Sequence, residues 1–191
     1  MNALQLFFKE SHQLSSDDLT FIADHFEKVS VPKGTVLFEQ GEVVDSVYFI
    51  AEGVLHHYNF NQEGEKVTLE LHDGPCFCTD LESFSEVKKS KDACVTLTDS
   101  TLYVLTKDKY DALINTNLKW AHIAKDIIAK TLIKMLDQLK VVSTKSIEQR
   151  YLELVKNKPL IIQNASVRDI ASYLGTSRET LHRIRKKNIF A

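Results

Sequence analysis

Residues 175–187, GTSRETLHRIRKK, carry Arg or Lys at five of their thirteen positions. On a helix that turns about 100° per residue, five polar side chains of this stretch share one face, while its two aliphatic side chains lie on the other. The shared face holds Arg178, Glu179, His182, Arg183 and Lys186. Arginine pairs bidentately with guanine, glutamate accepts a hydrogen bond from the cytosine amino group, and lysine neutralises phosphate. The stretch therefore predicts a helix face that binds the major groove of double-stranded DNA.

The residues around this stretch predict that it forms the second helix of a helix-turn-helix. Ser166 and Asp169 form a capping pattern that starts the first helix, and Gly175 suits the left-handed residue that ends it. Ser177 is placed to cap the second helix. Apolar residues of the two helices can close a small core, namely Val167, Ile170, Ala171, Leu174, Leu181 and Ile184. A solvated basic face on an ordinary helical hairpin is the alternative.

The distribution of charge indicates a polyanionic partner for this end of the chain. The 191 residues have a net charge of −2, but residues 140–191 hold eleven basic and four acidic residues, a net charge of +7. The preceding residues have a net charge of −9. A basic segment joined to an acidic one is typical of proteins that bind nucleic acid. A signalling module that uses these helices to contact a protein stays open, and steep weakening of binding by salt would exclude it.

Ahead of these helices, the sequence predicts an antiparallel β-roll of the jelly-roll type. Six runs rich in β-branched and aromatic residues lie between Val31 and Thr106, with glycines at positions 34, 41, 53, 64 and 74. Residues 61–64, NQEG, suit a hairpin turn. Residues 1–30 show helical spacing of apolar side chains, and residues 160–162 are expected to form a short strand. The predicted fold class is α+β.

A helix without Gly or Pro is predicted from about Asn117 to Val142. We expect its apolar stripe to form the two-fold seam of a homodimer, while packing on its own domain alone is the other interpretation. The stripe consists of Ala121, Ala124, Ile128, Thr131, Leu132, Met135, Leu139 and Val142. The expected domains are residues 1–115 for the N-terminal helices and the β-roll, 116–142 for the dimerisation helix and 143–191 for the helix-turn-helix.

Composition excludes several classes of protein. A hydrophobic content of 43% and a charged content of 26% are ordinary for a globular protein, and no membrane-spanning segment or membrane partner is expected. The N-terminal residues lack the pattern of a secretory signal. Three cysteines, Cys76, Cys78 and Cys94, are too few for a disulfide framework. We therefore expect a cytoplasmic protein.

From about Lys33 onward, the sequence resembles the Crp/Fnr family of bacterial transcription regulators. Residues 33–71 look like the cyclic-nucleotide-binding β-roll of that family, and SRETLHR, residues 177–183, is similar to its recognition-helix motif SRETxxR. The resemblance implies a sensor β-roll, a dimerisation helix and a helix-turn-helix. It also implies a homodimer on an imperfectly palindromic DNA site, with RNA polymerase as a further partner.

The resemblance assigns roles to single residues of the motif. It implies that Arg178, Glu179 and Arg183 contact base edges, and that Ser177 and Thr180 contact backbone phosphates. Members of the family continue past the recognition helix with a β-hairpin wing, whereas this sequence ends at Ala191. We therefore expect a helix-turn-helix without a full wing.

The sequence departs from the family where cyclic-AMP-binding members hold the cyclic phosphate. Those members use a Gly-Glu pair and an Arg followed by Ser or Thr, but residues 76–84, CFCTDLESF, contain no Gly-Glu. A buried phosphate without its arginine fork is poorly paired. We expect weak or no response to cyclic AMP, no resident cofactor, and an unidentified small-molecule effector. Its candidate ligand-binding residues are Thr79, Asp80, Lys89, Ser90 and Lys91.

Redox sensing and enzymatic activity have less support in the sequence. An iron–sulfur cluster needs four ligands, and the N-terminal segment contains no cysteine. A metalloenzyme of the cupin type is disfavoured because His56 and His57 are adjacent and face opposite sides of a strand, and His72 alone does not complete a site. Cys76 and Cys78 are expected to be packing residues rather than a reactive pair. We therefore expect no metal site and no enzyme.

Overall fold

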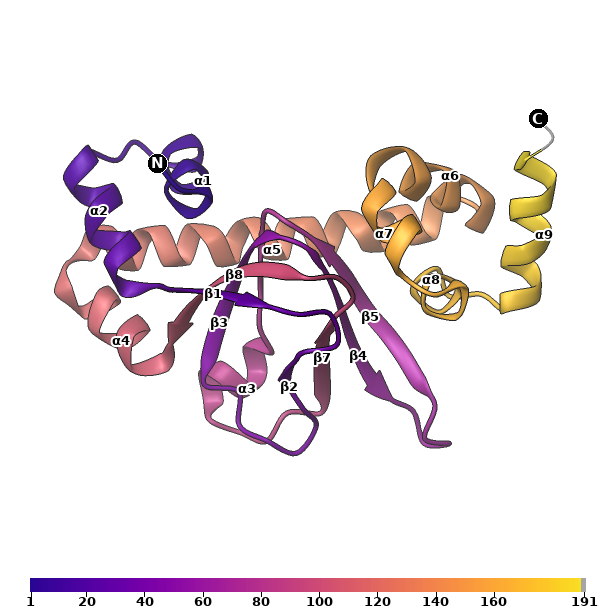
Figure 1. Ribbon diagram of the computed structural model, residues 1–191, viewed down its shortest axis with the longest axis horizontal. Coiled ribbons are helices and arrows are strands. Elements are labelled where there is room, and N and C mark those ends of the chain that lie inside the picture. Colours follow the sequence, from indigo (N-terminus) through magenta and orange to yellow (C-terminus); the bar gives the residue numbers. More distant parts are fainter. Residues whose placement is uncertain (190–191) are drawn as a thin grey trace.

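The computed structural model describes residues 1–189, with a β-roll at the centre and helices at both ends of a long helix (Figure 1). The strands are β1 (Glu27–Val31), β2 (Val36–Phe38), β3 (Ser46–Glu52), β4 (Val54–Phe60), β5 (Lys66–Asp73), β6 (Cys76–Cys78), β7 (Asp92–Thr96) and β8 (Ser100–Thr106). The helices that accompany the roll are α1 (Ala3–Ser11), α2 (Ser16–His25), α3 (Leu81–Glu86) and α4 (Lys107–Thr116). The long helix is α5 (Leu118–Thr144), and the last helices are α6 (Ile147–Asn157), α7 (Pro159–Asn164), α8 (Val167–Tyr173) and α9 (Arg178–Ile189). The predicted α+β class is confirmed.

Two four-stranded antiparallel sheets form the roll. Their strand orders are β1-β8-β3-β6 and β2-β7-β4-β5. The hairpin between β4 and β5 turns where the sequence predicts it: the Asn61 N–H donates to the Glu65 carbonyl at 3.0 Å, and Gly64 has a φ of +76°. This positive φ favours glycine because it has no Cβ. Side chains from both sheets fill the interior, including Phe38, Ile50, Leu55, Cys78, Cys94 and Leu102.

A second core fixes the N-terminal helices and the start of α5 to the outside of the roll. Leu4 and Phe8 of α1 pack with Phe49 of β3 and with Trp120 of α5 in one buried cluster. Trp120 also stacks on Phe21 of α2, with ring centroids 5.3 Å apart. These contacts hold only the first turns of α5, since its buried residues are Trp120 and Ile123.

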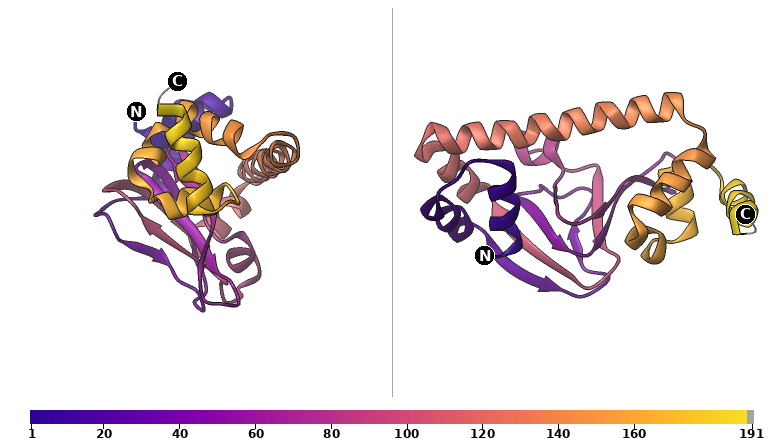
Figure 2. Two further views of the ribbon diagram at one scale, coloured as in Figure 1. Left: turned by 90° about the vertical axis from the view of Figure 1, so that its right-hand side faces the viewer. Right: turned by 90° about the horizontal axis from the view of Figure 1, so that it is seen from above.

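Beyond its first turns, α5 runs along one side of the molecule and connects the two lobes (Figure 2). It ends with the extended Lys145, after which Ser146 caps α6. The Ser146 hydroxyl accepts from the Gln149 N–H at 3.2 Å, and the Gln149 side chain accepts from the Ser146 N–H at 2.9 Å. These two bonds form a capping box, which fixes the change of chain direction after the long helix.

Two local predictions are wrong. Residues 160–162 lie in α7 rather than in a strand, because Pro159 occupies the first turn of that helix and its fixed φ favours a helix start. Ile161 is fully buried on the inner side of α7. Helix does not extend to residue 30, since β1 begins at Glu27 and pairs along its whole length with β8.

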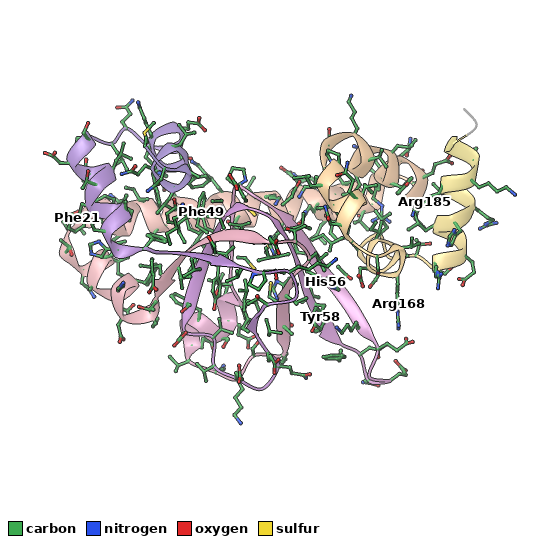
Figure 3. All side chains as sticks on the ribbon, viewed as in Figure 1. Phe21, Phe49, His56, Tyr58, Arg168 and Arg185 are labelled. Atoms are coloured by element: carbon green, nitrogen blue, oxygen red, sulfur yellow. The ribbon has the colours of Figure 1, made fainter. Side chains whose placement is uncertain are left out.

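The C-terminal helices pack against the β4–β5 hairpin. Val54 and Leu71 of the hairpin share a buried cluster with Ile161, Ile170 and Leu181, from α7, α8 and α9. Polar contacts border this cluster: the Thr68 N–H donates to the Ser172 hydroxyl at 2.9 Å, and Lys158 pairs with Asp73 at 3.0 Å. Arg168 points from α8 toward the tip of the hairpin (Figure 3), where it lies 3.6 Å from Glu65. The two lobes therefore meet through a packed surface as well as through α5.

Candidate nucleic-acid interface and effector region

The turn between α8 and α9 has the geometry that the sequence predicts. The Asp169 N–H donates to the Ser166 hydroxyl at 3.1 Å and caps the start of α8. Gly175 has a φ of +67°, and the Thr176 N–H donates to the Ala171 carbonyl at 2.9 Å. Such a bond across a left-handed glycine satisfies carbonyls that a helix end leaves open. Ser177 then caps α9, where its hydroxyl accepts from the Thr180 N–H at 3.2 Å.

The two faces of α9 differ as the helical spacing predicts. Leu181 is fully buried, and Ile184 packs against the same core. The side chains of the opposite face are all exposed, namely Arg178, Glu179, His182, Arg183 and Lys186. None of the ion pairs among the described side chains includes these residues. Arg185 lies on the side of α9 that faces α6 (Figure 3), and Lys187 pairs with Glu148 of α6 at 3.0 Å.

Glu179 is poised to act as a hydrogen-bond acceptor. Its pKa is lowered, first by its own backbone N–H at the start of α9 and then by the Ser177 hydroxyl. Ionised carboxylates are favoured at helix N-termini, where backbone N–H groups point outward. The Thr180 hydroxyl lies 3.2 Å from that of Ser177 and 3.5 Å from the Arg183 guanidinium, so these groups form one polar surface at the first turns of α9.

The candidate effector residues divide into a buried pair and exposed lysines. Asp80 caps α3 by accepting from the Ser83 N–H at 3.1 Å, and its other oxygen accepts from the Ser90 hydroxyl at 2.7 Å. Asp80 and Ser90 are both buried, whereas Lys89 and Lys91 are exposed. Thr79 donates to the Ser46 carbonyl at 2.9 Å. The structure therefore joins Asp80 to Ser90 but brings neither lysine into that buried pair.

The interior of the roll also holds a cluster that the sequence does not reveal. His57, His72 and Cys78 bring one potential ligand atom each to within 4.8 Å of one another. His57 lies in β4, His72 in β5 and Cys78 in β6. Only the pairing of these strands and the closure of the roll bring the three side chains together. The alternation of His56 and His57 is confirmed: His56 bonds the Thr68 hydroxyl at 2.8 Å, while His57 bonds Asp92 at 3.2 Å.

A β-roll, a long helix with an exposed stripe and a helix-turn-helix with a polar outer face define a protein that joins a β-roll domain to a motif common in DNA-binding proteins. Residues 28–117 match the family model described as the cyclic nucleotide-binding domain. Over most of its length the chain is similar to Crp/Fnr regulators with such a domain, as the sequence resemblance predicts.

Individual relatives show this similarity over most of the chain. The sequence is 24% identical over 177 residues to the cyclic AMP receptor protein of Thermus thermophilus, which covers 91% of this chain and 82% of the relative. The fold is similar to that of the c-di-GMP-responsive global regulator CLP of Xanthomonas campestris, with a TM-score of 0.69, 18% identity and 91% of each chain covered. FixK2 of Bradyrhizobium japonicum has a TM-score of 0.67 and 17% identity, over 85% of this chain and 83% of that one. Within residues 1–189, no helix is long and apolar enough to cross a membrane.

Proposed function

We propose that this protein is a homodimeric transcription regulator in which an effector-sensing β-roll controls DNA binding by the helix-turn-helix. The observation that carries this proposal is the division of α9 into a fully buried Leu181 and an exposed polar face. A helix held in this way can enter the major groove without disturbing its own core. The curated relative is named a cyclic AMP receptor protein, and CLP is named a global regulator.

Each polar residue of α9 receives a role in this proposal. Arg178, Glu179 and Arg183 contact base edges, where guanidinium groups pair with guanine and the carboxylate accepts from cytosine. Ser177 and Thr180, at the first turn of α9, contact phosphates. His182 and Lys186 lie on the same exposed face and border the base contacts. We keep the domain division at residues 1–115, 116–142 and 143–191 as part of the proposal, with α5 extending two residues further to Thr144.

The exposed stripe of α5 supports a dimer. Its side chains follow a repeat of four and three residues, and each is at least 44% exposed in the single chain, namely Ile128, Leu132, Met135, Leu139 and Val142. This repeat is that of a coiled-coil seam, which buries such side chains against a second helix. A two-fold axis along this seam would present two α9 helices to successive turns of one DNA duplex.

Arg178→Ala and Arg183→Ala are each expected to weaken specific DNA binding by about 1–3 kcal/mol and to relax base preference, because each removes a bidentate base contact. Lys186→Ala is the matched control: it should weaken binding to all sequences alike and reduce the salt dependence, because lysine neutralises phosphate. The measurement is fluorescence anisotropy on a site selected from random DNA and on unrelated DNA, at several salt concentrations. Equal losses on both DNAs for the arginine variants would contradict the assigned roles, and binding that salt does not weaken would favour a protein partner.

Cyclic AMP is expected to bind weakly or not at all. In the region that resembles the phosphate-binding segment of the family, the buried carboxylate of Asp80 accepts from Ser90, and a carboxylate repels a phosphate. Lys89 and Lys91 are exposed and do not offset this charge inside the roll. Isothermal titration calorimetry should therefore show no binding with a Kd tighter than about 1 mM. A micromolar affinity for cyclic AMP would show that this interpretation of Asp80 is wrong.

A further inference from the structure

Three potential metal ligands meet inside the β-roll. His57 of β4 and His72 of β5 lie on the same face of one sheet, because their cross-strand partners are Glu70 and Leu55 and paired residues share a face. Cys78 belongs to β6 in the other sheet and points into the same interior. One ligand atom of each residue lies within 4.8 Å of the other two.

The chemical state of these side chains fits a metal ion. Nε2 of His72 is buried and has no hydrogen-bond partner within the described residues, and a buried nitrogen without a partner costs about 1–3 kcal/mol. His57 is held by Asp92, whose Oδ2 lies 3.2 Å from its Nε2. A carboxylate bonded to one ring nitrogen is the usual means of orienting a metal-binding histidine. The three residues thus include one nitrogen that lacks a partner and one ring that is already oriented.

Cys78 is the third ligand and is almost entirely buried. The pKa of its thiol is raised well above the usual value, first by the bonded Cys94 thiol, 3.8 Å away, and next by burial, while His72 lowers it. An ion at the cluster would bind the thiolate and release the proton to solvent, so affinity should fall as the pH is lowered.

We propose that His57, His72 and Cys78 bind one Zn²⁺ ion in the interior of the β-roll, with a fourth position open to a solvent molecule or small ligand. Two imidazoles and one thiolate suit Zn²⁺, whereas Mg²⁺ and Ca²⁺ require oxygen ligands. Bond lengths of about 2.0–2.3 Å place neighbouring ligand atoms of a tetrahedral site about 3.3–3.8 Å apart. Closing the separation of up to 4.8 Å therefore requires side-chain movements of about 1 Å.

The position of the cluster gives the ion a route to the DNA-binding helices, a step that rests on the proposed function. Two neighbours of His72 in β5 make contacts outside the roll, one with the residue that precedes α7 and one with α5. Asp73 pairs with Lys158, next to α7, at 3.0 Å, and Glu70 lies 3.5 Å from the Gln138 amide of α5. Ligation that shifts β5 would change both contacts, and an ion that binds one arrangement more tightly shifts the equilibrium toward it. Zn²⁺ is therefore a candidate effector of the β-roll.

The test measures Zn²⁺ binding to the full chain after removal of metal by a chelator. Equilibrium dialysis with elemental analysis should give one Zn²⁺ per chain, and Co²⁺ should produce a near-ultraviolet thiolate-to-cobalt absorption band. Cys78→Ser should abolish that band, and His72→Gln should lower Zn²⁺ affinity at least about tenfold, since even outer-shell changes cost about 10–100-fold. Cys76→Ser is the matched control, because it removes a thiol that lies outside the three-ligand cluster while the serine hydroxyl can still bond Nδ1 of His72, which lies 3.9 Å from the Cys76 Sγ. It should bind Zn²⁺ as the parent chain does.

Three results would overturn the site: less than stoichiometric Zn²⁺, a cobalt–thiolate band that survives Cys78→Ser, or an equal loss with Cys76→Ser. Circular dichroism of each variant shows that it is folded before binding is measured. DNA affinity is measured separately with and without Zn²⁺. Stoichiometric Zn²⁺ without any change in DNA affinity would leave the metal site intact and overturn its effector role, while absence of DNA binding in both states would overturn the proposed function alone.

Discussion

Replacing Leu139 by Glu is expected to convert the protein from a dimer to a monomer at micromolar concentration. Leu139 is the fourth of the five side chains in the exposed stripe of α5 and is 64% exposed in the single chain. A two-fold seam would bury Leu139 of both protomers, and each buried leucine contributes about 1.5–3 kcal/mol to the free energy of dimerisation. The change also brings two carboxylates together across the axis. We therefore expect the dimer dissociation constant to rise at least about 100-fold, from a loss of about 3 kcal/mol or more.

Ile133→Glu is the matched control for this seam. Ile133 is 58% exposed on the same helix, but it lies about 120° away from Leu139 around the helix axis. Both substitutions add one carboxylate in place of an aliphatic side chain, and only Leu139→Glu should change the mass measured by sedimentation equilibrium. DNA affinity should fall with dimerisation, since a monomer reaches one half-site. A dimer that survives Leu139→Glu, or that is lost equally with Ile133→Glu, would contradict the seam.

The helix-turn-helix is the part of the molecule that sequence patterns predict best, because its determinants are local. Ser166, Gly175 and Ser177 act on backbone groups within a few residues, and each has the geometry expected of it. The division of α9 into two faces follows from helical periodicity alone. The docking of α8 on β5 could not be predicted in the same way, since Thr68 and Ser172 are distant in sequence and nothing in either segment specifies the other.

The strands of the roll are predictable from their composition, but the side chains that meet inside it are not. His57 and His72 each follow the alternation of their own strand, yet their proximity depends on the register between β4 and β5, which contains a bulge after His57. A shift of one residue would send either imidazole to the other face. Cys78 comes from the opposite sheet, so its approach requires closure of the roll. Strand alternation alone therefore could not predict whether these three side chains meet.

The errors in secondary structure occur where tertiary packing decides between alternatives. Residues 160–162 are three consecutive aliphatic residues, which suit a strand and a buried helix equally well. Pro159 and the burial of Ile161 against α8 and α9 favour the helix. β1 is similarly difficult to predict, because only Val29 and Val31 of its five residues are aliphatic and its hydrogen-bonding partners come from the distant strand β8.

Leu181→Ala is expected to lower the free energy of unfolding by about 2–5 kcal/mol, the range for a buried leucine whose removal leaves a cavity. Leu181 is fully buried, and its cluster includes Ile161 and Ile170 together with Val54 and Leu71 of the roll. The substitution therefore removes packing that holds α9 to α7, to α8 and to the β4–β5 hairpin. Leu160→Ala, on α7 and 49% exposed, makes the same chemical change outside this core and should cost much less.

Urea unfolding followed by circular dichroism measures both variants, with the slope of the transition compared as well as its midpoint. The same core holds α9 in place and so fixes the direction of its polar face. Leu181→Ala should therefore also weaken DNA binding at temperatures where the rest of the chain stays folded. Leu160→Ala should leave DNA affinity close to that of the parent protein. Equal destabilisation by the two changes would mean that Leu181 does not anchor α9, and the exposed face of that helix would then lack the fixed support that groove recognition requires.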